Sequence, residues 1–259
     1  DLAVVVFTRC GEVLSPMFQP PQDAKGPSPS KKEAKQILML LMKASISLLK
    51  ETRDAKLVSF VLQHLEKYLS FMSQLPKLAL PFLKAVVQLW SSSTTSQKVK
   101  LNAFLRIRQL AISQPFPFVE TVLKKTYLAY VETSRAASKS IASLANGMKA
   151  LTFMGNCLCD LYNIDHLSSY QHAFVYIRQL ALLLRAYTVS KSTESAQEVY
   201  SWQYLNCLKL WTVVIVDAVA KDPDTKLGSL LHPLVECIIG MVRHCPSPVR
   251  YLPLRFHCV

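Results

Sequence analysis

The chain has 259 residues, and 51% of them are apolar, which is enough to bury the core of one large domain or two ordinary ones. Thirty Lys and Arg residues against 17 Asp and Glu residues give a formal net charge of +13, which favours acidic partners such as nucleic acid or acidic protein segments. The best candidate for a membrane-spanning helix, 204–220, contains Lys209 and Asp217, so we expect no membrane span.

The two ends of the sequence indicate a piece of a longer protein. The chain begins at Asp1 and stops at Val259 inside an apolar pattern, and residues 1–14 are typical of the end of a truncated helix. Residues 15–30 contain five prolines and few large apolar side chains, so they cannot bury enough surface to offset their ordering entropy. We expect a flexible Pro-rich linker there and a helical-repeat domain over residues 31–259.

From residue 31 onward, apolar residues recur three and four positions apart, which is the spacing that lines one face of an α-helix. Strand-like alternation is scarce. Prolines and small polar runs divide the pattern into segments of mostly about 15 to 25 residues. The predicted helices cover 31–50, 55–72, 81–90, 97–113, 116–133, 144–162, 168–187, 198–220, 225–243 and a last one from 248. Between them, 134–143 is small and polar and predicts a longer connection or a weak helix.

Several helix boundaries carry recognisable signals. Ser30 followed by Glu33 is the pattern of a capping box, and Asp54 can cap the next helix. Pro81 suits the first turn of a helix. The sequence QPFP at Gln114–Pro117 predicts a tight turn that joins the flanking helices as an antiparallel pair.

The fold class predicted from this pattern is all-α. The helices come in successive pairs at intervals of roughly 40 residues, which is typical of an α-solenoid of HEAT or armadillo-like helical hairpins. A compact helical bundle is the alternative, although ten or more short-linked helices would be many for one bundle.

The segment Ser168–Tyr187, SSYQHAFVYIRQLALLLRAY, is apolar on nearly every side. A helix of that kind is usually buried between neighbours, so we expect it to be the central core helix. Its polar residues Gln171, Arg178 and Arg185 are seven apart and return to one narrow stripe. That stripe is either a solvated edge or part of a binding surface.

Residues that could carry out catalysis or bind a metal are poorly placed. Carboxylates are sparse and unpaired, and His166 and His172 are six apart, so they diverge on a helix. The two cysteines of NCLC, at Asn156–Cys159, point about 200° apart on a helix. The seven cysteines are scattered and are typical of reduced, buried thiols. We expect neither an enzyme nor a metal or cofactor site.

Basic residues suggest a binding role more strongly. Lysines and arginines are dense over 31–56, where Lys43, Lys50, Arg53 and Lys56 add to those selected below. Neutralising phosphates with such residues would make the affinity for RNA depend on salt. The alternative is that they only solvate the faces of a basic solenoid. The candidate RNA- or partner-binding residues are Lys31, Lys32, Lys35, Arg106, Arg108, Lys124, Lys125, Gln171, Arg178, Arg185, Arg250 and Arg255.

Four stretches of the sequence resemble one family. They are KKTYLAYVETSR at 124–135, SSYQHAFVYIRQLALLLRAY at 168–187, VYSWQYLNCLKLW at 199–211 and PVRYLPLRFHCV at 248–259. With the pattern between them, they are similar to the conserved helical region of the nucleolar complex protein 2 family, the Noc2-type ribosome assembly factors. The resemblance covers most of 98–259.

This resemblance implies a HEAT-like helical protein of the nucleolus and nucleoplasm. It implies a non-catalytic scaffold subunit in the assembly of the large ribosomal subunit. The implied partners are nucleolar complex protein 1 and nucleolar complex protein 3, each in a heterodimer, together with pre-ribosomal RNA and ribosomal proteins of the large subunit. A nuclear adaptor that binds histones, chromatin regulators or import cargo is the alternative, because helical repeats also hold such partners.

Overall fold

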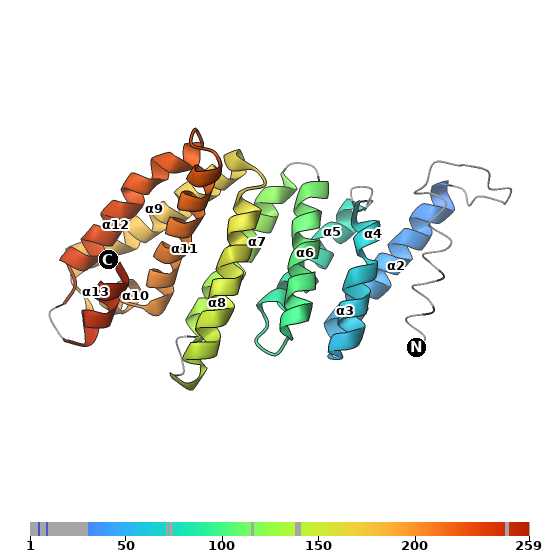
Figure 1. Cartoon of the computed structure of the whole chain (residues 1–259), viewed down its shortest axis with the longest axis horizontal. Coiled ribbons are helices and arrows are strands. Elements are labelled where there is room, and N and C mark those ends of the chain that lie inside the picture. Colours follow the sequence, from blue (N-terminus) through green and yellow to red (C-terminus); the bar gives the residue numbers. More distant parts are fainter. Residues whose placement is uncertain are drawn as a thin grey trace. The chain divides into compact units, whose positions relative to one another are not determined.

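The computed structural model describes residues 31–70, 72, 75–114, 117–137, 141–246 and 249–258, together with Val5 and Arg9. Within these residues the regular structure is helical and contains no strand (Figure 1). The all-α class predicted from the sequence is therefore confirmed. The rest of 1–14, the Pro-rich 15–30 and its last residue Ser30 lie outside the described residues, and the predictions made for them stay predictions.

Contacts divide the chain into two compact units, residues 1–115 and 116–259. In the first unit, α6 lies against α3, α4 and α5, and α5 also packs on α2. Trp90 and Phe82 of α5 and Met42 of α2 are fully buried, so α5 supplies the centre of this core. The helices of the first unit are α2 (Lys31–Glu51), α3 (Ala55–His64), α4 (Glu66–Leu69), α5 (Pro76–Ser91) and α6 (Gln97–Ser113).

Local side chains set the helix boundaries of the first unit. Asp54 caps α3 as predicted, because its Oδ1 accepts a hydrogen bond from the backbone N–H of Lys56 at 2.9 Å. The predicted start of α5 at Pro81 is wrong. Pro76 takes the first turn, where a missing N–H costs nothing, and Pro81 lies inside the helix. The predicted single helix 55–72 is interrupted at Leu65, whose carbonyl accepts from Tyr68 three residues on, in a tighter turn.

The second unit is built on contacts of α7 with α8, α9 and α11. The long helix α9 also packs against α10, α12 and the 3-10 turn η3. Trp211 of α11 and Tyr162 of α8 are its largest fully buried side chains. The elements of this unit are α7 (Phe118–Ala137), α8 (Ile141–Tyr162), α9 (His166–Ser190), α10 (Thr193–Val199), α11 (Trp202–Lys221), η3 (Lys226–Leu230), α12 (Leu231–Arg243), η4 (Val249–Tyr251) and α13 (Leu252–Cys258).

Two helices predicted in this unit are interrupted. The predicted 198–220 is split, because α10 ends at Val199 and the hydroxyl of Ser201 caps α11 by accepting from the N–H of Tyr204 at 3.1 Å. The predicted 225–243 begins as a 3-10 turn, and α12 starts only at Leu231. Pro233 has no N–H with which to bond the carbonyl four residues before it, so the α-helical ladder cannot extend further back through it.

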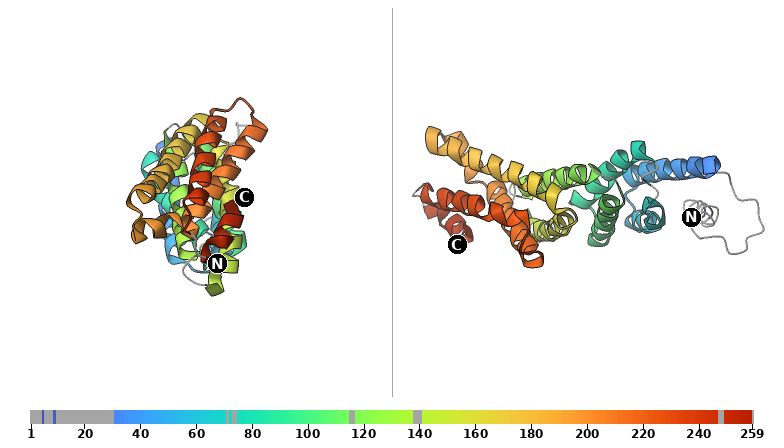
Figure 2. Two further views of the ribbon diagram at one scale, coloured as in Figure 1. Left: turned by 90° about the vertical axis from the view of Figure 1, so that its left-hand side faces the viewer. Right: turned by 90° about the horizontal axis from the view of Figure 1, so that it is seen from above.

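The prediction that 168–187 is buried on nearly every side is wrong. One face of α9 is buried and carries Ala173, Ile177, Leu180 and Leu184. Its opposite side exposes large apolar residues, because α7, α10, α11, α12 and η3 cover only one face. In the right-hand view of Figure 2, α9 (light orange) follows an edge of the second unit, with α11 and α12 to one side of it. The exposed large apolar side chains of α9 are Leu167, Phe174, Val175, Leu182, Leu183 and Val189.

A glycine allows α12 to approach α9 closely. A Cβ atom at Gly240 would lie 2.9 Å from Cδ2 of Leu184, closer than side chains tolerate. A side chain at position 240 would therefore require the end of the Leu184 side chain to shift.

Neighbouring helices pair within each unit, as α5 does with α6 and α7 with α8. The predicted α-solenoid of HEAT or armadillo-like helical hairpins stays a prediction, as does the predicted pairing of 97–113 with 116–133. Pro115 and Phe116 of the QPFP turn lie outside the described residues.

We expect Leu180→Ala to lower the free energy of unfolding of the second unit by about 2–5 kcal/mol, because it removes most of a buried side chain and leaves a cavity in the core. Leu182→Ala on the same helix is the matched control and should change it by less than about 0.5 kcal/mol. The exposed fractions are 6% for Leu180 and 51% for Leu182. Urea denaturation followed by circular dichroism measures both, and equal effects would contradict the observed orientation of α9.

Candidate functional site

Among the described residues, the carboxylates that have close partners make contacts within the fold. Asp217 accepts hydrogen bonds from Lys221 at 2.8 Å and from Asn163 at 2.6 Å, and the Lys221 ammonium holds the pKa of the Asp217 carboxyl below its ordinary value. In the parts of the chain that the structure describes, no three His, Cys, Asp or Glu side chains come together to hold a metal ion. None of the described helices has the length and hydropathy needed to cross a membrane.

An aromatic cluster joins four helices at the centre of the second unit. The Trp211 ring of α11 lies 5.2 Å, centroid to centroid, from both Tyr127 of α7 and Tyr162 of α8. Nδ1 of His172 in α9 is 2.8 Å from the Tyr162 hydroxyl oxygen. Burial, helped by the charge of Lys124, lowers the pKa of His172 to about 4, so the imidazole is neutral at pH 7. The cluster is therefore an uncharged part of the core.

The buried cysteines are poor nucleophiles. Burial raises the pKa of the Cys159 and Cys207 thiols to about 11. Because the thiolate is the reactive form, these side chains act as small apolar groups that fill the core.

The predicted binding residues have different environments. Arg106 and Arg255 make contacts within the fold, and Lys125 is half-buried. Lys31, Lys32 and Arg250 lie in helical segments, but their side chains are outside the described part of the structure. The exposed members are Lys35 and Arg108 in the first unit and Lys124, Gln171, Arg178 and Arg185 in the second.

Arg106 shows that a basic residue is not necessarily available to bind a partner. Its side chain is 8% exposed, and Nη2 donates to Oε2 of Glu66 at 2.9 Å, which ties α6 to α4. Arg255 is half-buried and donates from Nη2 to the backbone carbonyl of Cys245 at 3.3 Å. We therefore assign both arginines to the fold. Neither partner is a sequence neighbour, so the sequence alone does not reveal these pairs.

The exposed face of α9 has a regular composition. Gln171, Val175, Arg178, Leu182, Arg185 and Val189 follow one another at alternating steps of four and three residues. We call these six residues the α9 seam. Apolar and polar members alternate along it, and the apolar members Val175, Leu182 and Val189 are 48%, 51% and 79% exposed. Such spacing is typical of one side of a helix pair.

The arginines of the α9 seam form no ion pair in the described structure. Helix α9 contains no Asp or Glu among its 25 residues. Within the described structure, the guanidinium groups of Arg178 and Arg185 form no ion pair or hydrogen bond. Glu236 of α12 lines a groove beside Arg185 without pairing with it. The seam therefore combines exposed apolar area with two available positive charges.

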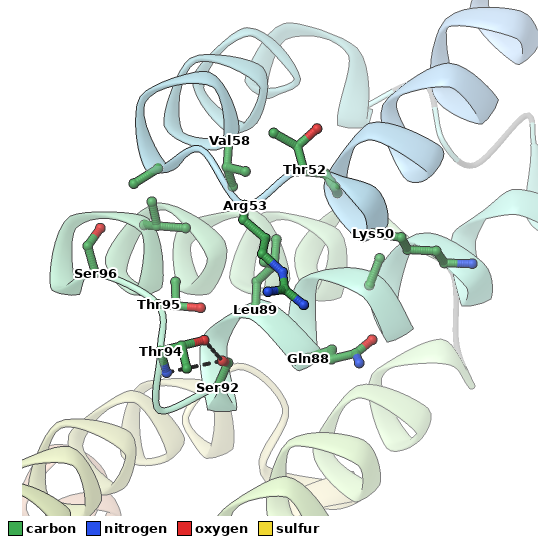
Figure 3. A pocket seen from close by; sticks show the side chains of 14 residues that line it. Lys50, Thr52, Arg53, Val58, Gln88, Leu89, Ser92, Thr94, Thr95 and Ser96 are labelled. Carbon is green, nitrogen blue, oxygen red and sulfur yellow. Dashed lines mark hydrogen bonds between the residues drawn. The ribbon is translucent and has the colours of Figure 1, made fainter.

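A pocket of about 480 Å³ lies on the first unit, where the end of α2 and the start of α3 face the α5–α6 connection (Figure 3). We call it the basic pocket. Its cations are Lys50 and Arg53, both exposed, and no Asp or Glu lines it. The hydroxyl residues of its lining are Thr52, Ser92, Thr94, Thr95 and Ser96, and in Figure 3 the Lys50 ammonium points away from Arg53 and from the 92–96 segment.

The chemistry of the basic pocket suits an anion. The Oγ of Ser92 is 3.0 Å from Oγ1 of Thr94 and accepts from the Thr94 N–H at 3.3 Å, which orders this rim (Figure 3). Hydroxyl donors with an unopposed guanidinium and ammonium are the groups that bind phosphate oxygens. Lys50 and Arg53 belong to the basic stretch 31–56 but are not among the twelve candidate residues. The polar run SSSTTS at 91–96 supplies most of the hydroxyl groups of the pocket.

Comparison with known proteins identifies relatives. A family model described as the Noc2p family matches residues 117–259, which is nearly the whole second unit. Nucleolar complex protein 2 of Drosophila melanogaster is 36% identical, and the match covers 83% of this chain and 26% of the fly protein. Nucleolar complex-associated protein 2 of Arabidopsis thaliana is 28% identical over 100% of this chain and 33% of the plant protein.

An uncharacterised NOC2 family protein of Schizosaccharomyces pombe is 29% identical over 100% of this chain and 37% of the yeast protein. The chain thus spans between about a quarter and two fifths of the length of these relatives. Both the α9 seam and the aromatic cluster lie inside the segment that the family model matches.

We expect the second unit to lose stability as the pH falls from about 6.5 toward 4. Because burial lowers the pKa of His172 to about 4, the unfolded chain binds the proton more readily in that window. The slope from this one group is at most about 1.4 kcal/mol per pH unit. Urea midpoints at pH 7 and pH 5 measure it, and His172→Gln should flatten the dependence. An unchanged slope in the variant would show that other groups cause it.

Proposed function

Because this chain belongs to the Noc2p family, we propose that it is a non-catalytic scaffold subunit in the nucleolar assembly of the large ribosomal subunit. The fly relative is named a nucleolar complex protein and the plant relative a nucleolar complex-associated protein, which supports a nucleolar location for this chain. We place it in the nucleolus and nucleoplasm. The proposed partners are nucleolar complex protein 1 or nucleolar complex protein 3, with pre-ribosomal RNA and ribosomal proteins of the large subunit.

One observation carries the proposal. The segment that matches the family folds as the second unit, and its longest helix exposes the α9 seam. Exposed apolar residues in a regular row indicate a surface that binds another protein. A scaffold subunit needs such a surface and no reactive group. This agrees with the raised pKa of the buried thiols and with the neutral His172.

Contact with RNA is the second part of the proposal. The net charge of +13 favours nucleic acid, and the lining of the basic pocket contains cations and hydroxyl groups but no Asp or Glu. Lys35 and Arg108 are exposed on the same unit. Phosphate contacts of this kind position a protein on RNA without reading its sequence.

Affinity purification of the tagged full-length protein from nuclear extract tests the assembly role. We expect the precursor RNA of the large subunit and a companion nucleolar complex protein to be recovered with it. Recovery of histones or import receptors without precursor RNA would overturn the proposal in favour of a nuclear adaptor. Precursor RNA of the small subunit, probed in the same sample, is the control for nonspecific capture.

A salt titration tests the basic pocket. We expect Lys50→Ala with Arg53→Ala to weaken binding of a labelled single-stranded segment of large-subunit precursor RNA. The slope of log affinity against log salt should fall by about 1.4, because two phosphate contacts are lost. Lys77→Ala with Lys84→Ala is the matched control, since both lysines are exposed on α5 and lie outside the pocket. Equal effects of the two pairs would show that the pocket has no special role.

A further inference from the structure

The α9 seam is one half of a helix pair, and we infer that an acidic amphipathic helix of a partner protein packs along it. The seam runs from Gln171 to Val189, a length of about 27 Å at roughly 1.5 Å per residue. Its steps of four and three residues average 3.5, which is the period of a left-handed helix pair. Side chains at this period stay on the contact line through about five turns.

The residues of the α9 seam determine which side chains the partner helix must carry. Val175, Leu182 and Val189 need apolar residues that repeat every seven positions on the partner helix. Arg178 and Arg185 lie between them and need carboxylates at the facing positions, because neither guanidinium has a partner in the described structure. An arginine at a contact position lowers the affinity for an ordinary apolar helix and favours one with Glu or Asp there.

A second copy of this chain does not fit the seam. Helix α9 has no acidic residue, so pairing of two seams would bring arginines together without a counter-charge. RNA fits poorly as well, because Val and Leu offer nothing to phosphate and lack the ring faces on which bases stack. The occupant that satisfies both kinds of seam residue is an acidic helix with an apolar stripe.

This inference rests on the proposed function, because it assigns the surface through which the scaffold holds a protein partner. The contact is orientated by the buried face of α9, since Ile177, Leu180 and Leu184 hold the helix in place from the other side. The seam therefore exists before the partner binds. Docking needs no rearrangement of the second unit, and little ordering entropy is lost on this side of the contact.

Site-specific photo-crosslinking tests the inference in the full-length protein. Leu182→p-benzoylphenylalanine places the reactive ketone on the seam, and mass spectrometry of material from irradiated cells identifies the attached peptide. We expect a peptide of another protein with apolar residues every seven positions and Asp or Glu between them. A peptide from this chain, a peptide of basic or aperiodic sequence, or the absence of an adduct would overturn the inference.

Charge reversal provides a second measurement. Arg178→Glu with Arg185→Glu should reduce recovery of the cross-linked partner by about tenfold or more, and reversal of the facing acidic residues to Lys should restore it. Lys149→Glu with Lys226→Glu makes the same change in net charge at exposed positions of the same unit and should leave recovery within about twofold. Equal recovery with both double variants would contradict the arginine contacts.

Two controls distinguish a failure of the inference from a loss of folding and from a failure of the proposed function. Circular dichroism should show unchanged helicity and melting for Arg178→Glu with Arg185→Glu, and a loss of folding would show that these arginines are internal, which overturns the seam. Precursor RNA of the large subunit is measured in every purification. If the wild-type protein recovers none, the proposed function fails. If the wild type and the seam variant recover precursor RNA and partner alike, the inference alone fails.

Discussion

The arrangement of the second unit depends on the burial of Trp211 where α7, α8 and α11 meet beside α9. Its indole ring is in contact range of rings from Tyr127 and Tyr162, and the imidazole of His172 completes the cluster. A buried aromatic residue of this size contributes on the order of 3–5 kcal/mol relative to alanine. Four helices share that contribution, so the orientation of each is tied to the others.

The exposure of the α9 seam follows from that packing. A helix turns about 100° per residue, so the burial of Ala173, Ile177, Leu180 and Leu184 on one side fixes which residues face away. Single exposed apolar residues are common on protein surfaces. The α9 seam differs because its apolar residues recur every seven positions between arginines. The two positive charges keep this face hydrated in the free protein and oppose its pairing with itself.

The sequence predicted the existence of most helices correctly, because the period of apolar residues is a local property. The predicted helix boundaries were wrong where a single side chain determines the first residue of a helix. Ser201 does so for α11 and Pro76 for α5. The prediction that α9 is buried on nearly every side was wrong for a different reason. An apolar pattern shows that a face can be buried, but the number of neighbouring helices decides whether it is.

For the candidate sites too, features carried by one helix could be predicted, whereas contacts between distant residues could not. Arg106 and Arg108 are two residues apart on one helix, and one is paired inside the fold while the other is exposed. The difference comes from Glu66, which is distant in sequence. The basic pocket also needs residues 50–53 to meet 92–96, a juxtaposition that no local pattern reveals. The stripe of Gln171, Arg178 and Arg185 could be predicted because a single helix carries it.

The two surfaces use positive charge in different ways, and this separates their partners. The basic pocket combines cations with hydroxyl residues in its lining, so the proposed binding of phosphate there would be electrostatic and would weaken steeply as salt rises. In the α9 seam the arginines alternate with Val and Leu, whose burial against a partner is insensitive to moderate salt. Ionic strength therefore weakens phosphate contacts before it weakens the helix contact. Under the proposed function, a protein with both surfaces can release RNA at an ionic strength at which it still keeps its protein partner.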